Sequence, residues 1–324
     1  MPDRRMRRAS MGKNSNLTER DAVGRLFFLL SRQYRIVIRQ AVALKPNVIA
    51  IATSHGSFVA KAYHSLVAAE RQAWLLAALR RSGFFAAPAV VPIGHGGVIT
   101  AGGRHWLLTE YVASARPFVF VNECDIKDGL QALHSYHVAT ARIVCDKRAA
   151  MRLPSVQLYE KWRRCYDEFC RHLPFIETAM EKEDILFTLR WAHYCLATCG
   201  DYAQELAAEP VVIIHGDVAP HNFLRTAGGD VYMIDYDAAA LASPGLDYWQ
   251  YANRILPHIG WSYSALARFV PLGRWLEKSW FLHALLFPAD VFREWRQAAA
   301  RRRPLVLDRK KREWFVRRLF AMLK

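Results

Sequence analysis

One stretch of the chain, residues 211–237, constrains its fold more than any other. It reads VVIIHGDVAPHNFLRTAGGDVYMIDYD. Its two apolar runs, residues 211–214 and 231–234, are typical of short buried strands. Two glycines and an aspartate at residues 228–230 form a hairpin-type turn just before the second run. The pattern predicts two strands of one small sheet, joined by short loops, with polar residues gathered at one end.

Three polar side chains of this stretch are candidates for chemistry: Asp217, Asn222 and Asp235. The set suits phosphoryl transfer, because one carboxylate can orient and deprotonate an acceptor hydroxyl. The carboxamide and the other carboxylate can hold Mg²⁺ against nucleotide phosphates. The alternative is that these residues only cap turns. The whole phrase, with both apolar runs in register, favours a catalytic site.

The His-Gly-Asp motif at residues 215–217, followed by a proline and Asn222, resembles the aminoglycoside phosphotransferase and choline kinase family. Protein kinases use a His-Arg-Asp motif and an Asp-Phe-Gly metal loop instead. The resemblance implies that Asp217 is the catalytic base, Asn222 a metal ligand and Asp235 the main metal ligand. Asp237 is a weaker candidate for a supporting role or a second metal.

The basic charge of the chain bears on its partners. The net charge is +16, and much of it lies near the two ends, at residues 4–8 and 301–312. Such a balance indicates polyanionic partners, which include nucleotides, nucleic acids and anionic surfaces. No zinc finger, RNA-recognition signature or helix-turn-helix phrase accompanies it. Nucleic-acid binding is therefore the least supported of the candidate functions.

Length and cysteine usage set further bounds. The 324 residues, 52% of them hydrophobic, can fill two lobes or domains. The six cysteines form no CxxC pair and no zinc spacing, which favours free thiols in a reducing compartment. No apolar run is long enough to span a bilayer, and the basic N-terminus is not followed by a secretory apolar region. We expect a cytoplasmic protein.

The first third of the chain resembles the smaller lobe of a kinase. Residues 1–16 are basic and polar and are expected to be disordered, whereas residues 17–33 predict an amphipathic helix. Short strands follow, and then a helix at residues 64–82. The phrase Phe-Val-Ala-Lys that ends at Lys61 resembles the third-strand lysine motif, so Lys61 is expected to contact the nucleotide phosphates and to pair with Glu70. The alternative is a surface lysine and a surface glutamate.

This lobe departs from protein kinases between its first strands. No glycine lies between residues 38 and 48, so a GxGxxG phosphate loop is absent from the sequence. Further along, residues 106–112 resemble the last strand of the lobe and the hinge. The resemblance implies that backbone groups of Glu110, Tyr111 and Val112 hydrogen-bond adenine. The boundary between the lobes is expected near residue 113.

The remainder predicts a mainly helical lobe. Residues 123–143 are expected to form a helix with two histidines, His134 and His137, which fit core or interface positions better than a metal pair. Four aromatic residues could line a pocket for a cationic amine through cation–π contacts, but plain helix packing is the commoner role; they are Trp162, Tyr166, Trp191 and Tyr194.

The last part of the chain holds one more candidate, Asp247, at the start of a helix. The family resemblance implies that it braces the catalytic loop, and a helix N-cap is the compatible alternative. Residues 247–256 and 262–287 predict apolar helices. The basic tail from residue 291 predicts an amphipathic helix, either for an anionic surface or packed on its own lobe.

The resemblance implies one fold and one leading function. We expect an α+β, protein-kinase-like fold, with a small antiparallel-sheet N-lobe over residues 17–112 that binds nucleotide. A mainly helical C-lobe over residues 113–324 is expected to hold the catalytic and acceptor-binding residues. The implied reaction moves the γ-phosphoryl group of ATP or GTP, with Mg²⁺ as cofactor, to a hydroxyl of a small molecule.

The resemblance also extends to the spore-coat kinase-like proteins of sporulating bacteria. The alternative function is therefore a non-catalytic, kinase-like structural protein, for example of a spore coat. The missing glycine loop favours this alternative, and the retained lysine, asparagine and aspartates favour the enzyme. Aminoglycoside pockets carry many carboxylates, so a chain with only 29 acidic residues suits a sugar, polyol, phosphorylated metabolite or protein hydroxyl better.

Overall fold

The computed structural model describes residues 21–145, 153–301 and 308–324, and the tail expected over residues 1–16 lies outside them. The chain divides into two compact units. The first comprises the described residues up to Ala115 together with Leu224–Asp237. The second comprises Arg116–Phe223 and Ala238–Lys324. The first unit is therefore completed by a segment that returns from the second half of the sequence.

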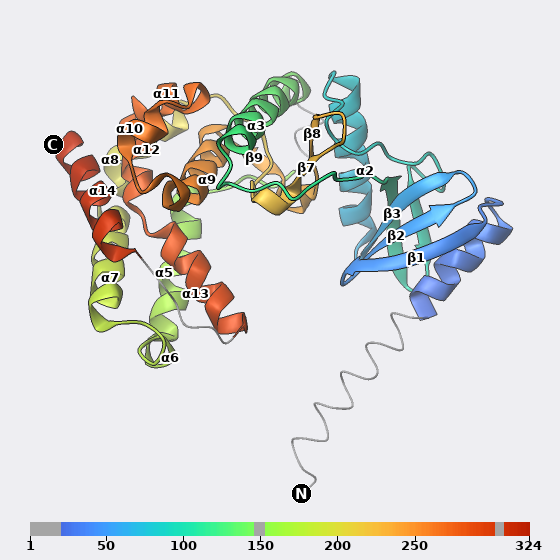
Figure 1. Cartoon of the computed structure of the whole chain (residues 1–324), viewed down its shortest axis with the longest axis horizontal. Coiled ribbons are helices and arrows are strands. Elements are labelled where there is room, and N and C mark those ends of the chain that lie inside the picture. Colours follow the sequence, from blue (N-terminus) through green and yellow to red (C-terminus); the bar gives the residue numbers. More distant parts are fainter. Residues whose placement is uncertain (1–20, 146–152, 302–307) are drawn as a thin grey trace, which may run out of the picture. The chain divides into compact units, whose positions relative to one another are not determined.

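The first unit is built on a five-stranded antiparallel sheet (Figure 1). The strand order is β1-β2-β3-β5-β4. The strands are β1 (Ile38–Lys45), β2 (Val48–Thr53), β3 (Gly56–Tyr63), β4 (Val98–Ala101) and β5 (Arg104–Glu110). A separate two-stranded sheet pairs β7 (Phe223–Arg225) with β8 (Val231–Met233).

Two helices pack against the five-stranded sheet. The helix of residues 21–32 buries Leu26 and Leu30 in a cluster with Ile51 and Ala60 of the strands. Helix α2 (Leu66–Arg81) packs against β3 and β5. Because side chains alternate along a strand, the residues of β3 on either side of Ala60 point to the opposite face of the sheet. Val59 and Lys61 lie on that opposite face and line a cavity.

The second unit is mainly helical (Figure 1). One short antiparallel pair joins β6 (Val212–Ile214) to β9 (Ala240–Ala242). The helices are α3 (Glu123–Val144), α5 (Leu158–Arg171), α6 (Leu173–Ile176), α7 (Lys182–Ala197), α8 (Cys199–Ala207), α9 (Gly245–Ile255), α10 (Tyr263–Ala267), α11 (Val270–Leu276), α12 (Ser279–Leu286), α13 (Ala289–Arg301) and α14 (Arg309–Met322).

The two apolar runs of the 211–237 stretch form strands, but not in one sheet as expected. The first run is β6, which pairs with β9, and the second is β8, which pairs with β7. The turn between β7 and β8 is closed by two backbone hydrogen bonds between Thr226 and residues Gly229 and Asp230. The partner strands β7 and β9 have three residues each, too few to show a strand period in the sequence.

The single apolar helix expected over residues 262–287 is also wrong, because three short helices, α10, α11 and α12, replace it. Pro271 lies in the first turn of α11, where a missing N–H costs no helical hydrogen bond. The start of α12 is fixed by the Glu205 carboxylate, which accepts the N–H groups of Ser279 and Trp280 at 3.2 and 2.9 Å. These caps favour new helix starts over one continuous helix.

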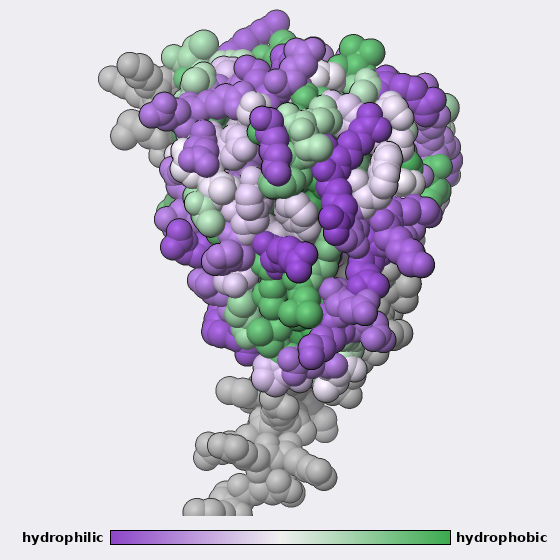
Figure 2. All heavy atoms as spheres, turned by 90° about the vertical axis from the view of Figure 1, so that its left-hand side faces the viewer, coloured by the Kyte–Doolittle hydropathy of each residue, from purple (hydrophilic) through white to green (hydrophobic). Residues whose placement is uncertain are grey.

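The described part of the basic tail packs on its own unit. Phe315, Val316 and Leu319 of α14 are fully buried, and the buried Arg312 Nε donates to Asp290 at 2.9 Å. This packing answers the question left open for the tail. Figure 2 views the side on which α7 and α14 lie, where hydrophilic residues cover most of the face between smaller apolar areas. Within the described residues no helix is long and apolar enough to cross a membrane.

The aromatic residues proposed for a cationic pocket serve packing where the structure shows their contacts. Trp162 is 1% exposed and stacks on Phe287 at 4.3 Å between ring centroids. Trp191 and Tyr194 contact the ring of Phe320 from α14. All six cysteines are free.

Candidate active site

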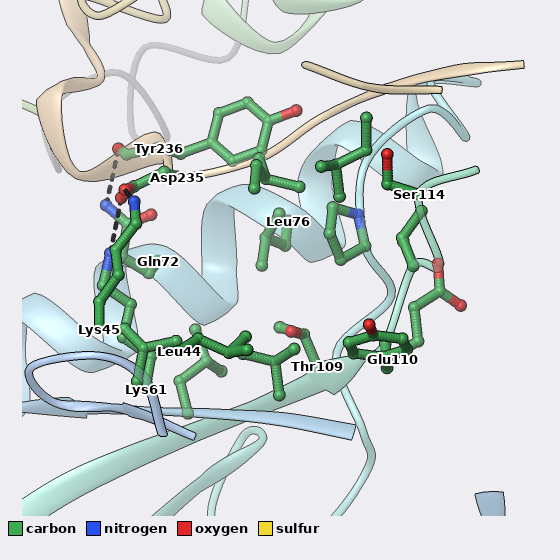
Figure 3. Close-up of a pocket in the computed structure, with 18 of the residues that line it drawn as sticks. Leu44, Lys45, Lys61, Gln72, Leu76, Thr109, Glu110, Ser114, Asp235 and Tyr236 are labelled. Carbon is green, nitrogen blue, oxygen red and sulfur yellow. Dashed lines mark hydrogen bonds and ion pairs between the residues drawn. The ribbon is translucent and has the colours of Figure 1, made fainter. Parts of the chain in front are cut away.

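The first unit contains a cavity of about 310 Å³. Figure 3 shows its two ends: Lys45, Lys61 and Asp235 lie together at one, and Glu110 lies with Ser114 at the other. Between the ends the lining is mostly aliphatic; it includes Leu44, Val48, Val59, Leu76, Leu107 and Ile234. The cavity thus combines an apolar middle with charged groups at one end and backbone at the other.

A compact ion cluster occupies the charged end. The Lys61 ammonium lies 2.7 Å from Asp235 Oδ1 and 2.6 Å from Asp237 Oδ2. Lys45 lies 3.5 Å from the other oxygen of Asp235. Tyr63 donates its hydroxyl to Asp237 at 3.1 Å, and burial with the charges of Asp237 and Asp235 raises the pKa of Tyr63. Two lysines and two aspartates are therefore collected within one unit.

Asp235 has a backbone conformation that suits its residue type. Its φ is 67°, in the left-handed region that aspartate enters more readily than most residues. Burial would raise the pKa of its carboxyl, but the hydrogen bond and charge of Lys61, with a contribution from Lys45, outweigh burial and lower it. Asp235 is therefore ionised at neutral pH and available to a cation.

The expected ion pair between Lys61 and Glu70 is not found among the described residues. Glu70 lies on α2, as expected, but it does not line the cavity. The carboxylates of Asp235 and Asp237 take the Lys61 ammonium instead. Sequence spacing placed Glu70 on the right helix but could not tell which carboxylate reaches the lysine.

Three consecutive residues, Glu110, Tyr111 and Val112, line the opposite end of the cavity. The Glu110 N–H donates to the Ala89 carbonyl at 2.8 Å. The Tyr111 N–H donates to the Ser57 carbonyl at 3.0 Å. No hydrogen bond of the Val112 N–H is found within the described part of the chain. Of these three backbone donors, only that of Val112 is free for a ligand.

In the second unit the His-Gly-Asp motif follows β6 directly. Gly216 has φ +78°, and a Cβ there would lie 2.2 Å from the Ala238 carbonyl oxygen. Both the positive φ and this close approach require glycine. The motif therefore differs from the His-Arg-Asp form for a steric reason.

Asp247 braces this loop, as the family resemblance implied. Its fully buried carboxylate accepts the backbone N–H of His215 at 2.7 Å and that of Gly216 at 2.9 Å. His137 Nε2, from α3, lies 2.9 Å from the same carboxylate. Burial would raise the pKa of Asp247, but hydrogen bonding and charge from His137 lead the contributions that lower it. The alternative N-cap role is wrong, because α9 begins at Gly245.

Two further residues of α9 hold the same loop. Gln250 donates its amide to the Gly216 carbonyl at 2.9 Å, and Arg254 lies 2.6 Å from Asp217 Oδ1. Their spacing from Asp247, three and seven residues, places all three on one face of a helix. Sequence reasoning missed Gln250, Arg254 and the role of His137, although the helical spacing from Asp247 was a usable signal.

Asn222 lies beside Asp217 and is 1% exposed. Its amide donates to the backbone carbonyl of Asp217 at 2.9 Å and to the carboxylate at 3.2 Å. The amide oxygen Oδ1 is buried and has no hydrogen-bond partner among the described residues. Such an orphaned acceptor is unusual in a native core and fits an oxygen ligand for a hard cation.

No group of three or more His, Cys, Asp or Glu side chains in the described residues is placed to hold a metal. This finding is compatible with Mg²⁺, which keeps several waters and binds through one or two carboxylates together with substrate phosphates. The donors present, the Asp235 carboxylate and the Asn222 oxygen, are of the type that Mg²⁺ prefers.

Comparison with known proteins identifies the family. The model of the phosphotransferase enzyme family matches residues 43–270, well over half of the chain. The chain belongs to this family, and the expected enzyme class, a phosphotransferase acting on an alcohol group, is confirmed. No curated protein matches the chain in a sequence search.

Solved structures show the same fold. An aminoglycoside phosphotransferase from Alicyclobacillus acidocaldarius superposes with a TM-score of 0.64 at 20% identity, over 89% of this chain and 93% of that one. A spectinomycin phosphotransferase bound to AMP gives 0.54 at 15% identity, over 91% and 94%. A choline/ethanolamine kinase family protein from Mesorhizobium loti gives 0.50 at 13% identity, over 94% and 95%. The expected α+β, protein-kinase-like fold is thereby confirmed.

Proposed function

We propose that the protein transfers the γ-phosphoryl group of ATP or GTP to a hydroxyl group of a small molecule. The observation that carries the proposal is the cavity of the first unit, whose ends match the two ends of a nucleotide. The Val112 N–H offers a donor to a base, and the Lys61 and Lys45 ammonium groups offer charge to phosphates. The aliphatic lining between them suits a flat base.

The volume and the comparisons support a nucleotide in this place. A cavity of about 310 Å³ lies at the lower end of the range of roughly 300–1,000 Å³ for small-molecule sites. The spectinomycin phosphotransferase with the same fold binds AMP. We assign base binding to the backbone of residues 110–112 and phosphate binding to Lys61. For Glu70 we propose only a supporting position on α2.

Asp217 is the proposed base. Its carboxylate accepts a hydrogen bond from the acceptor hydroxyl and takes the proton as the hydroxyl oxygen bonds to the γ-phosphorus. The bond between the γ-phosphorus and the bridging oxygen breaks, and ADP or GDP leaves with that electron pair. Asn222 holds the Asp217 carboxylate through its amide, and Arg254 holds it from the other side.

Asp235 and Asn222 are the proposed metal ligands. Mg²⁺, when bound, would neutralise charge on the transferring phosphoryl group. Asp235 supplies an ionised carboxylate, and Asn222 supplies an oxygen that lacks a protein partner. Asp237, already held by Lys61 and Tyr63, is the proposed support of that end of the cavity.

The test is a thermal-unfolding titration with Mg·ATP and with Mg·GTP. A ligand that binds only the folded state raises the unfolding temperature by mass action. We expect a metal-dependent rise for the wild type and its loss in Asp235→Asn. The matched control is Asp230→Asn, an exposed aspartate in the turn between β7 and β8, which should behave as the wild type.

The two outcomes separate the enzyme from its alternative. A rise that is equal in wild type and Asp235→Asn would show that the charged end of the cavity does not hold the metal and phosphates. No rise with either nucleotide at about 100 times an ordinary Kd, where about 2.7 kcal/mol of stabilisation is expected, would favour a non-catalytic kinase-like protein.

A further inference from the structure

The second unit has its own cavity, of about 220 Å³, and Asp217 forms part of its wall. Helices α5, α9 and α13 enclose it together with the loop at Gly216. Four cationic side chains line it: Lys161, Arg254, Arg293 and Arg296. Asp217 is the one carboxylate among the lining residues of this cavity. A hydroxyl that reaches Asp217 from this side therefore enters a basic environment.

Some of these cations have carboxylate partners. Arg254 is paired with Asp217 itself, and Arg296 Nε donates to Glu168 at 3.1 Å. Arg293 contacts its chain neighbour Glu294 at 3.3 Å. These pairs reduce the positive charge of the wall without cancelling it, because Lys161 remains.

Lys161 is the cation that lacks such a partner. Its ammonium makes no ion pair or hydrogen bond with any residue that the structure describes. The residue as a whole is exposed, but the surrounding protein removes water from its ammonium, and this desolvation lowers the pKa. Burial, with the nearby charge of Arg293, also lowers the pKa of Arg254 to about 10. Both side chains would gain from an anion placed among them.

The aromatic residues of this cavity do not offer an alternative site for a cation. A cation–π site needs an accessible ring face. Trp162, Trp249, Phe287 and Phe292 are each 4% exposed or less. Trp162 and Phe287 cover each other by stacking at 4.3 Å, and Trp249 donates its indole N–H to the Ala284 carbonyl at 2.8 Å. Between the aromatic and the cationic side chains of the wall, the cationic ones are therefore the more accessible.

We propose that the acceptor is a small hydroxyl compound that carries an anionic group, a phosphate monoester being the form that fits best. The proposal rests on the proposed function, because it takes Asp217 as the base. Near neutral pH a phosphate monoester carries close to two negative charges and three acceptor oxygens. Lys161 and Arg293 bind this group, and the hydroxyl lies at Asp217. Arginine suits phosphate because its planar fork donates two parallel hydrogen bonds.

Size and charge also exclude one acceptor class. The cavity is smaller than the roughly 300–1,000 Å³ of drug-sized sites, which suits a sugar- or glycerol-sized compound. A polycationic acceptor would meet like charges at this wall, and like-charge contacts act against binding. We therefore expect this cavity to prefer anionic acceptors over cationic ones such as a polycationic drug.

The test uses calorimetric binding with three kinds of probe in the presence of Mg·ADP. The probes are glucose 6-phosphate and glycerol 3-phosphate, the unphosphorylated glucose and glycerol, and the cations kanamycin and choline. We expect each phosphorylated probe to bind at least about tenfold more tightly than its unphosphorylated counterpart, since hydrogen bonds to charged groups are stronger than those between neutral groups. With Mg·ATP, the protein should also form ADP faster when a phosphorylated probe is the acceptor than when any other probe is.

The variants Lys161→Gln and Arg293→Gln locate the anion site. Each should weaken binding of the phosphorylated probe by about tenfold and leave glucose and Mg·ADP binding unchanged. The control is Lys310→Gln, an exposed lysine of α14 outside the cavity. Equal binding of phosphorylated and neutral probes, preference for a cation, or no weakening in the two variants would overturn the proposal. Failure of Mg·ADP to bind would instead count against the proposed function itself.

Discussion

The two cavities of this protein differ in how their charges are arranged. In the first unit, two lysines pair with two aspartates at one end of the cavity, and the middle of the wall is mostly aliphatic. In the second unit, four cations face a single carboxylate, and the aromatic side chains are covered. The cavity of the first unit therefore suits any nucleotide that binds together with a metal. The cavity of the second unit, by our proposal, selects the acceptor by its negative charge.

This difference indicates that the family resemblance informs about the reaction but not about the acceptor. The motif residues Lys61, Asp217, Asn222 and Asp235 are the ones that we propose for the phosphoryl transfer, and the family resemblance points to them. The cations Lys161, Arg293 and Arg296 lie outside those motifs, on helices α5 and α13. The acceptor must therefore be argued from the cavity of this chain rather than from the substrates of similar enzymes.

The largest expected effect tests the proposal that Asp217 is the general base. Asp217→Asn should lower turnover by roughly 10²–10⁴-fold, because the general base is lost while the shape is kept. Binding of Mg·ADP should stay within twofold of the wild-type value. Asp217 does not line the cavity of the first unit, so its replacement should change the binding free energy by ~0.4 kcal/mol or less. Steady-state ADP release and calorimetry measure the two quantities.

The control for this variant is Asp201→Asn, an exposed aspartate of α8. It should leave turnover unchanged. Wild-type turnover in Asp217→Asn would show that Asp217 is not the general base. The basic cavity would then no longer be supported as the acceptor site.

The next effect concerns the stability of the second unit. Asp247→Asn should lower the free energy of unfolding by about 3 kcal/mol, because a buried charge that accepts two backbone N–H groups and faces His137 is lost. Denaturant unfolding measures the difference. A loss below about 0.5 kcal/mol, as for surface substitutions, would contradict the bracing role.

The same variant has a pH signature. The pKa of Asp247 is lowered in the folded state, so its ionised form stabilises the fold above the ordinary aspartate pKa of about 3.9. This stabilisation is lost as the pH falls through the folded-state pKa. The gap in unfolding free energy between wild type and Asp247→Asn should be constant above about pH 5 and shrink below about pH 4. A gap that widens in acid would mean that the carboxyl is protonated in the fold.

A smaller effect tests the steric explanation of the His-Gly-Asp motif. Gly216→Ala should destabilise the protein by about 2 kcal/mol, since the residue has φ +78° and the new Cβ would meet the Ala238 carbonyl. The matched control is Gly200→Ala on α8, where a Cβ meets nothing within 4 Å and helix propensity improves. Equal stability of the two variants by thermal unfolding would refute the steric reason.

The smallest effect concerns the base end of the nucleotide cavity. Val112→Pro removes the free N–H and should weaken Mg·ATP binding by about three- to tenfold, the value of one neutral hydrogen bond. Ala113→Pro removes a neighbouring N–H of a residue that does not line this cavity, so it should bind as the wild type. Equal weakening in both variants would show that the backbone conformation, and not the donor, matters there.

The sequence predicted the strands and α2 of the first unit well, because alternation and helical periodicity are local signals. It also predicted the stretch that holds Asp217, Asn222 and Asp235. It failed at the pairing of β6 with β9, since three-residue strands are recognised only by the partners they find in space. The start of α12 within residues 262–287 depended on Glu205, more than 70 residues away in sequence.

The side-chain partners were less accessible to sequence reasoning. The choice of Lys61 between Glu70 and the two aspartates depends on distances that no spacing encodes. Arg254 could have been found from its seven-residue spacing to Asp247 on one helix. The basic wall of the second cavity could not, because Lys161 and Arg293 are 132 residues apart along the chain, on two different helices. Overall charge only hinted at an anionic partner.

The most direct measurement of the central claim is a crystal structure of the protein with Mg·ADP. We expect the adenine to hydrogen-bond the Val112 N–H, the phosphates to contact Lys61, and the metal to be bound by Asp235 and Asn222. A nucleotide outside the cavity of the first unit, or none at saturating concentration, would contradict the assignment of both the nucleotide site and the reaction.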